Sequence, residues 1–300
     1  MMHRLQRWMG KGPSAMILAG LFFSGMASLV KLIGQSHFSV FQIIFFRAGV
    51  AALIIAAMTR NRGIPLLGEN HGMLLIRSVS GCIAMTLNFY AISKINLGDA
   101  AVLNQSSPFF VMIFSWLFLG EKFYYSLLLL TVVSFIGITF VLHPSGQLMN
   151  PAALAGLGSA IFAAMAYVAI RHLHKTDSFW TMAFYFMATA AVLSFFPMLY
   201  TWKNPNFFEV IILCLTGLLG TFGQLLMTYA YKHEAASWVA PFSYLGVLFS
   251  FIFGILFFDE IPTLWTILGG VLAVGSGILI VRFKNKVSVP LPSGLPPKAD

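Results

Sequence analysis

The chain has 300 residues, of which 59% are hydrophobic and 9% charged, and its mean hydropathy is +0.86. Soluble globular domains carry about 25% charged residues, so this composition excludes that class and predicts an all-α polytopic membrane protein. The excess of 18 Lys and Arg over 9 Asp and Glu would favour nucleic-acid binding in a soluble protein. In a membrane protein it is explained by cytoplasmic loops, which collect basic residues, and we expect no nucleic-acid partner.

The first apolar run, residues 15–33, follows three basic residues and resembles a signal peptide at first sight. It is longer than the apolar core of a signal peptide, which has about 7 to 15 residues, so we expect it to be the first membrane span. Cys82 and Cys214 both lie inside apolar runs, and their spacing predicts neither a disulfide framework nor a metal site.

Ten apolar runs are long enough to cross a membrane, since each helical crossing needs about 20 residues. Their connections are short, so successive helices are expected to be antiparallel neighbours. A proline-rich tail at 284–300 is expected to be disordered. The approximate limits of the runs are 14–34, 40–59, 71–92, 98–118, 125–143, 152–171, 179–200, 208–231, 236–258 and 262–282.

The distribution of Lys and Arg predicts the orientation. With these spans, 13 basic residues lie on the side of the N-terminus and only Lys94 and Lys203 lie on the other side. Because basic loops stay in the cytoplasm, both termini are expected to be cytoplasmic in a bacterial inner membrane.

Matching positions in the two halves indicate an internal repeat. Leu18, Tyr90 and Glu121 correspond to Leu154, Tyr229 and Glu260, at offsets of 136, 139 and 139 residues. Two repeats of five helices, 14–143 and 152–283, follow a basic N-terminus at 1–13. Because five is odd, the second repeat is expected to be inverted in the membrane, as in transporters with a central binding site.

A cluster of polar residues, Asn104-Gln105-Ser106-Ser107-Pro108, lies within the fourth span. Polar groups are costly in lipid, so this cluster is expected to face other helices or a water-filled cavity. The segment from Trp238 to Glu260, which contains most of the ninth span, is its expected inverted counterpart.

Several short motifs recur around the second, fourth and ninth spans. They are Arg47 in the second, Ser107-Pro108 and Leu119-Gly120-Glu121 around the fourth, and Ala240-Pro241 and Phe258-Asp259-Glu260 around the ninth. In this order and spacing they resemble the EamA-type, ten-helix members of the drug/metabolite transporter superfamily over about residues 14–283. The chain departs from the family pattern at Gly246-Val247, where a proline is common, and at Asp259, which replaces a glycine. The segments 240–244 and 259–262 resemble the branch that includes uptake carriers for S-adenosylmethionine.

The resemblance implies a central cavity lined by the first, third and fourth spans and by the sixth, eighth and ninth. These spans carry amides, which both donate and accept hydrogen bonds, and aromatic rings, which stack or bind cations. A site for a small polar or zwitterionic solute is therefore expected. Its candidate residues are Asn88, Tyr90, Asn104, Gln105, Tyr167, Gln224, Tyr229, Trp238 and Tyr244.

A structural role competes with binding at several of these positions. Tyr and Trp near span ends commonly anchor at the membrane interface, which leaves Tyr90 and Trp238 open to both interpretations. The amides Asn104, Gln105 and Gln224 lie inside spans, where lipid exposure would cost an amide about 1 to 3 kcal/mol. A cavity role is therefore favoured for the amides.

Three basic residues fall inside predicted spans. Lys31 lies near the outer end of the first, and Arg47 lies seven residues into the second, roughly 10 Å deep. Each either binds a substrate carboxylate or pairs with Asp99 at the outer start of the fourth span, and snorkelling to the interface is preferred for Lys31. Arg77, seven residues in from the cytoplasm, is also expected to snorkel.

The acidic residues are expected at span ends or in loops, away from the bilayer midplane where a proton relay would place one. We therefore favour facilitated diffusion or solute exchange by alternating access, with proton-coupled export of amino acids or drugs as the alternative. Glu121 and Glu260 end symmetric spans, and capping of neighbouring helices is one role open to both, since carboxylates are favoured at helix N-termini. Gate or structural roles are assigned to Asp99, Pro108, Glu121, Pro241 and Glu260.

Other function classes receive less support. No His-Glu-x-x-His motif, Asp pair or Ser/Lys dyad lies at a span centre, which disfavours a membrane-embedded enzyme. A passive channel or a lipid flippase is a further alternative. We expect a small-molecule solute and the lipid bilayer as partners, no metal or cofactor, and a monomer or homodimer.

Overall fold

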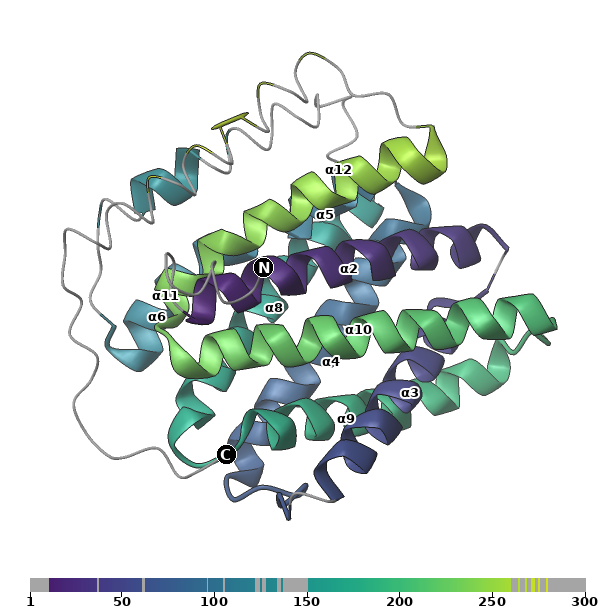
Figure 1. Ribbon diagram of the computed structural model, residues 1–300, viewed down its shortest axis with the longest axis horizontal. Helices are drawn as coiled ribbons and strands as arrows, with labels where there is room; N and C mark the ends of the chain where they lie inside the picture. Colours follow the sequence, from purple (N-terminus) through teal and green to yellow (C-terminus); the bar gives the residue numbers. More distant parts are fainter. Residues whose placement is uncertain are drawn as a thin grey trace.

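Helices are the only regular secondary structure in the residues that the computed structural model describes (Figure 1). Most of the predicted fifth and tenth spans, the first ten residues and the predicted tail lie outside these residues. The structure describes residues 11–36, 38–60, 63–95, 97–104, 106–121, 128–133 and 151–259, together with single positions at 125, 136, 264, 268, 271, 272, 275 and 279.

Six of the predicted spans are continuous helices whose limits differ from the predicted ones by at most three residues. In the described part of the chain, seven segments are long and apolar enough to cross a membrane, the seventh being Ala240–Phe258. The six continuous helices are α2 (Lys11–Gln35), α3 (Val40–Arg60), α4 (His71–Lys94), α8 (Pro151–His172), α9 (Phe179–Tyr200) and α10 (Phe207–His233).

The fourth and ninth spans differ from a single continuous helix. The fourth consists of α5 (Leu97–Asn104) and α6 (Ser107–Leu119), and the ninth of α11 (Ala236–Val239), the 3₁₀ turn η3 (Ala240–Ser243) and α12 (Tyr244–Phe258). Pro108 lies in the first turn of α6 and Pro241 in the first turn of η3. Proline lacks an N–H and fits best in the first turn of a helix, where no helical donor is needed, so Pro108 and Pro241 favour the start of a new helical segment.

The two broken spans are equivalent in length and position. The limits of α5 recur 139 positions later as the limits of the α11–η3 segment. The last residues of α6 and α12, Leu119 and Phe258, are also 139 positions apart. Both spans end in a residue with left-handed backbone, Gly120 (φ 63°) and Asp259 (φ 53°). Asp259, which replaces the family glycine, thus adopts the conformation that glycine favours.

The two broken spans run in opposite directions. The carboxylate of Glu121, just after α6, accepts a hydrogen bond of 3.2 Å from the backbone N–H of Ala236, at the start of α11. Beyond this point η3 packs against α6, and α12 then packs against α5 (Figure 1). The second broken span therefore follows the first from its end toward its beginning.

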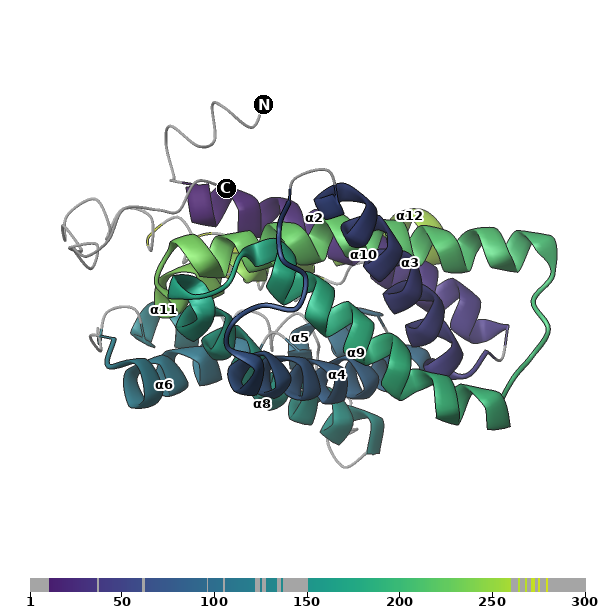
Figure 2. The same ribbon diagram turned by 90° about the horizontal axis from the view of Figure 1, so that it is seen from below.

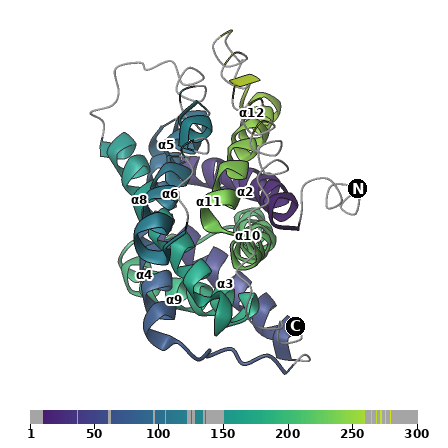
Figure 3. The same ribbon diagram turned by 90° about the vertical axis from the view of Figure 1, so that its left-hand side faces the viewer.

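The contacts between helices repeat when the two halves are exchanged. The contact of α2 with α10 corresponds to that of α8 with α4, the contact of α2 with α12 to that of α8 with α6, and the contact of α3 with α10 to that of α9 with α4. Figures 2 and 3 show the result as one layer containing α2, α10 and α12 and another containing α4, α5, α6 and α8. Each half thus packs mainly against the other half.

A close crossing of α2 and α12, within one layer, joins the two halves of the chain. A Cβ atom added to Gly20 would lie 2.9 Å from the Cα of Gly246, so neither position has room for a side chain. One turn along α2, the hydroxyl of Ser24 donates to the carbonyl of Gly246 (2.7 Å) and accepts from the hydroxyl of Ser250 (3.0 Å). Small residues and hydroxyls of this kind commonly hold membrane helices together.

An ion pair joins the two halves at the end of the bundle where α6 and α8 terminate. Arg171 Nε lies 3.6 Å from Glu121 Oε1, and the two side chains are 10% and 15% exposed. Arg171 also donates to the carbonyl of Lys232 at 3.0 Å. Together with the hydrogen bond from Ala236 to Glu121, this network connects α6, α8, α10 and α11.

Substituting Gly20 by alanine tests the crossing of α2 and α12. The added methyl group must displace the α12 backbone, and overpacking of this kind typically costs about 1 to 3 kcal/mol. Gly49→Ala is the matched control, because Gly49 is also helical and a methyl group added there would meet no described atom within 4 Å. Thermal unfolding in detergent should show Gly20→Ala melting lower than the wild type and Gly49→Ala melting no lower. Equal melting temperatures for both variants would contradict the close crossing.

A double-mutant cycle tests the Glu121–Arg171 ion pair. Glu121→Gln or Arg171→Gln leaves one largely buried charge without its partner, at an expected cost of about 1 to 3 kcal/mol. The double variant removes both charges, so neither is left buried without the other. Its loss of stability should therefore be smaller than the sum of the losses in the two single variants, by a coupling energy of at least about 0.5 kcal/mol. Unfolding by titration with a denaturing detergent measures this coupling, and strictly additive losses would exclude an interaction between the two side chains.

Candidate functional site

A cavity lies between the two layers, with about 180 Å³ available to the centres of water molecules. On α2 it is bordered by residues from Met16 to Ala27. These positions lie between two packed apolar clusters, one containing Ala15, Met16 and Ala19 and the other Met26, Val30 and Ile33. The stretch of α2 that borders the cavity is therefore flanked on both sides by packed apolar side chains.

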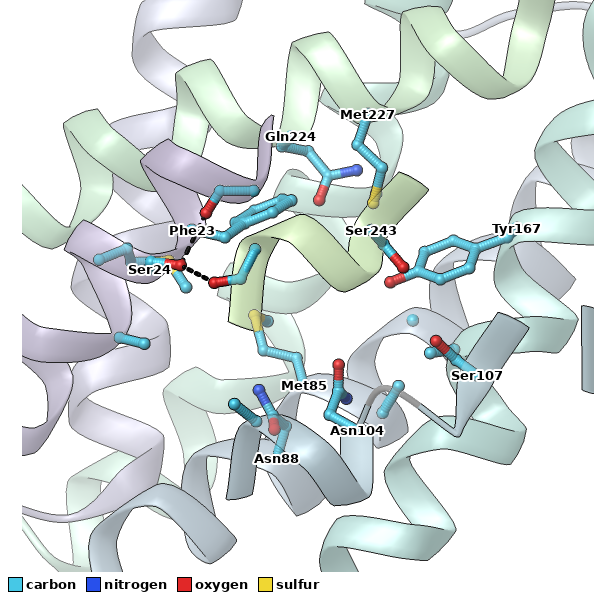
Figure 4. Close-up of a pocket in the computed structure, with 18 of the residues that line it drawn as sticks. Phe23, Ser24, Met85, Asn88, Asn104, Ser107, Tyr167, Gln224, Met227 and Ser243 are labelled. Atoms are coloured by element: carbon cyan, nitrogen blue, oxygen red, sulfur yellow. Dashed lines mark hydrogen bonds between the residues drawn. The ribbon is translucent and has the colours of Figure 1, made fainter. Parts of the chain in front are cut away.

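Both broken spans contribute to the cavity at the places where they are interrupted. Asn104 ends α5, Ser107 begins α6 and Ser243 ends η3, and all three line the cavity (Figure 4). The Asn104 amide donates to the hydroxyl of Ser159 at 2.9 Å, which fixes its orientation. The breaks thus bring polar groups from both halves to one space.

The long helices add amide and aromatic groups. Figure 4 shows the Tyr167 hydroxyl and the Gln224 amide directed into the cavity from α8 and α10, opposite Asn88 of α4. The Tyr167 ring stacks on Tyr231 with centroids 4.7 Å apart, and the Gln224 amide donates to the Thr228 hydroxyl at 3.0 Å. The Asn88 Oδ1 atom is buried and has no hydrogen-bond partner in the described part of the chain.

Two arginines, Arg47 and Arg77, also line the cavity. Only 4% of Arg47 and 1% of Arg77 are exposed, so the expectation that Arg77 snorkels to the interface is wrong. The Arg77 guanidinium lies 4.1 Å from the centroid of the Phe186 ring. It turns toward the protein interior because Gly81, one turn further along α4, leaves room for it: a Cβ atom there would lie 2.5 Å from the Arg77 Nη1 atom.

Several predicted site residues lie away from the cavity. Tyr90 is 38% exposed, and Tyr229 packs on the Phe179 and His233 rings. Trp238 is buried against Phe242. Tyr244 is buried and donates through its hydroxyl to the carbonyl of Thr131 at 3.4 Å. Lys31 places its amine 4.9 Å from the centroid of the Phe258 ring.

The structure thus gathers five of the predicted binding residues around one space. Their role in binding a solute stays a prediction. Gln105, Glu260 and the side chain of Asp99 lie outside what the structure describes. The predicted residues that line the cavity are Arg47, Asn88, Asn104, Tyr167 and Gln224, and Pro108, assigned a gate or structural role, is buried beside them at the start of α6.

Most of the α4 residues that line the cavity were not predicted from the sequence. Arg77, Gly81, the adjacent pair Ala84 and Met85, and Asn88 line the cavity. They recur every three or four residues along α4, which is the spacing of one helix face. This periodicity is visible in the sequence. However, a charged residue seven positions into a span also fits snorkelling, and the periodicity alone does not show that the face borders a cavity.

Comparison with known proteins identifies the family. The model of the EamA-like transporter family matches residues 10–143 and 150–282, one match for each half. A solved crystal structure that covers 89% of this chain and 98% of its own has the same fold, with a TM-score of 0.71 at 17% sequence identity.

Three relatives illustrate the range of similar proteins. The pseudopaline exporter CntI of Pseudomonas aeruginosa is 37% identical over 271 residues, covering 90% of this chain and 95% of the exporter. Solute carrier family 35 member G1 of Homo sapiens is 30% identical over 90% of this chain and 78% of its own length. An S-adenosylmethionine uptake transporter of Rickettsia bellii is 26% identical over 82% of this chain and 85% of its own length. The resemblance found in the sequence is confirmed: the chain belongs to the EamA-like transporter family, within the drug/metabolite transporter superfamily.

Proposed function

We propose that the chain is a secondary transporter that carries a small polar or zwitterionic metabolite across the bacterial inner membrane by alternating access. One observation carries the proposal: the polar cavity is built from the interrupted spans of both halves, with Asn104 and Ser107 from one and Ser243 from the other. In transporters made of inverted repeats, solute sites lie at the interface of the repeats and are formed by discontinuous helices.

The chemistry of the cavity supports a polar solute. Asn88, Asn104 and Gln224 supply both donors and acceptors, and Tyr167 adds a hydroxyl next to an aromatic face. Buried polar groups are costly unless they are satisfied by protein, by water or by a ligand. A solute with several hydrogen-bonding groups satisfies them, whereas a lipid chain does not.

The symmetric packing of the two halves supports alternating access. The main contacts between the described helices of the two halves have counterparts with the halves exchanged, so a packing adopted by one half is geometrically available to the other. In alternating access the two halves would rock so that the cavity opens at one end of the bundle while it closes at the other. This requires rocking of packed helices and no unfolding.

Facilitated diffusion or exchange is favoured over proton-coupled antiport. None of the described residues that line the cavity is Asp or Glu, the residues from which a membrane proton relay is usually built. The higher identity to the pseudopaline exporter than to the S-adenosylmethionine uptake transporter supports export as the direction of net transport.

Removal of the Tyr167 hydroxyl tests the site. Tyr167→Phe should raise the KM for the transported solute roughly two- to tenfold, as expected for one hydrogen bond of about 0.5 to 1.5 kcal/mol. Tyr90→Phe removes the same group from a residue outside the cavity and should leave KM unchanged. Counterflow into proteoliposomes, with labelled amino acids, organic acids, S-adenosylmethionine and quaternary amines, identifies the solute and measures both variants.

Two outcomes of this experiment would contradict the proposal. Uptake that rises linearly with concentration and shows no counterflow would indicate a channel. Equal KM values for Tyr167→Phe and the wild type, with a solute that is transported saturably, would move the binding site away from this cavity.

A further inference from the structure

The charge of the cavity indicates what kind of solute it binds. Its described lining contains two arginines, Arg47 and Arg77, and no acidic residue. The Nε atoms of both are buried without a hydrogen-bond partner in the described part of the chain. An uncompensated buried charge is strongly unfavourable, so a cavity that retains two of them is suited to a ligand that supplies the opposite charge.

The surroundings of Arg47 leave most of its hydrogen-bonding capacity unused. Its guanidinium contacts the thioether sulfur of Met85 and lies 5.5 Å from the centroid of the Phe89 ring. Gly220 of α10 gives it room, because a Cβ atom there would lie 2.7 Å from Arg47 Nε. A thioether is a weak acceptor and a ring accepts little from five N–H donors, so strong acceptors are lacking.

Arg77 is in the same situation. Its guanidinium lies over the Phe186 ring and beside Gly81, and stacking of this kind satisfies the face of the cation but not its N–H groups at the edge. A planar guanidinium with a free edge matches the geometry of a carboxylate, to which it donates two parallel hydrogen bonds.

The positions of the two arginines along α4 give their approximate spacing. Arg77 lies beside Gly81, whereas Arg47 lies beside Met85 and Phe89, which are one and two turns further along the helix. At about 5.4 Å per turn, the two guanidinium groups are roughly 5 to 10 Å apart along α4. One carboxylate cannot satisfy both edges at the longer of these distances, but two carboxylates on a short carbon chain can.

We propose that the solute of this transporter carries two carboxylate groups, one bound by Arg47 and the other by Arg77. This inference rests on the proposed function, because it names the solute class of the same cavity. Neutral metabolites and those with a single carboxylate would leave at least one buried guanidinium without a partner and are expected to bind more weakly.

Matched pairs of small solutes test the proposal. Succinate, glutarate, adipate and L-glutamate are compared with their monoamides, succinamate, glutaramate, adipamate and L-glutamine, which keep the size but lose one charge. Thermal unfolding of the full-length protein in detergent gives the affinity of each from the rise in melting temperature with concentration. At least one diacid should bind ten or more times as tightly as its monoamide.

Substitution of the arginines assigns this discrimination to the cavity. In Arg77→Gln and in Arg47→Gln, diacid and monoamide should bind within about threefold of each other. Without solute, each variant should melt at the wild-type temperature or above, because a buried charge without a described partner has been removed. Arg60→Gln is the control: it removes the same group from an exposed residue of α3 and should keep the discrimination.

The outcomes separate this inference from the proposed function. The inference is overturned if both arginine variants still prefer a diacid over its monoamide, or if no diacid stabilises the wild type. It is also overturned if inorganic phosphate or a sugar phosphate stabilises the protein as much as the best diacid does. Saturable counterflow of a solute with fewer than two carboxylates, in the absence of diacid binding, would overturn it and leave the transporter assignment intact. Diacid stabilisation that is lost in Arg77→Gln, without any counterflow, would support the site and contradict transport.

Discussion

Backbone N–H and C=O groups inside a bilayer must find partners within the protein, and this constraint governs where the helices of this transporter break. The interruption between α5 and α6 is bridged by short-range hydrogen bonds, from Ser106 to Leu103 and from Phe109 to Ser106. In the other half, η3 replaces one helical turn, and the Ser243 hydroxyl donates to the carbonyl of Ala240. Because the breaks are buried between the layers, they expose polar groups to a cavity and not to lipid. The position of the breaks in the sequence therefore determines where the cavity lies.

The same constraint explains which parts of the fold could be predicted from the sequence. In a bilayer, a long apolar run can satisfy its own backbone groups only as a helix, so six spans were predicted to within three residues at each end. The repeat was also visible, because offsets such as that from Glu121 to Glu260 persist through the broken spans. The Glu121 carboxylate accepts a hydrogen bond from the N–H of Ala236 at the start of α11, and its gate or structural role stays a prediction. A continuous helix was the wrong expectation at Pro108 and Pro241, although both prolines mark the interruptions.

The candidate site was harder to predict, because residue type does not determine which way a side chain faces. Asn104 and Gln224 were favoured for the cavity since an amide in lipid is costly, and both line it. Tyr244 has the same polar group as Tyr167 but uses it on the carbonyl of Thr131, a contact across 113 residues that no local pattern reveals. Arg77 was assigned to the interface because its depth permits snorkelling. Only packing shows that Gly81 and Phe186 form a place for it inside.

The inverted arrangement connects this site to movement. The breaks place the polar groups where the halves meet, and under the proposed function the halves would exchange conformations around them. The most direct test measures two distances by double electron–electron resonance, with spin labels on the exposed residues Lys94 and Lys203 at one end of the bundle and Arg60 and Lys175 at the other. On addition of a transported solute, the account predicts that one distance distribution shortens while the other lengthens. Changes of the same sign at both ends, or no change at either, would contradict alternating access.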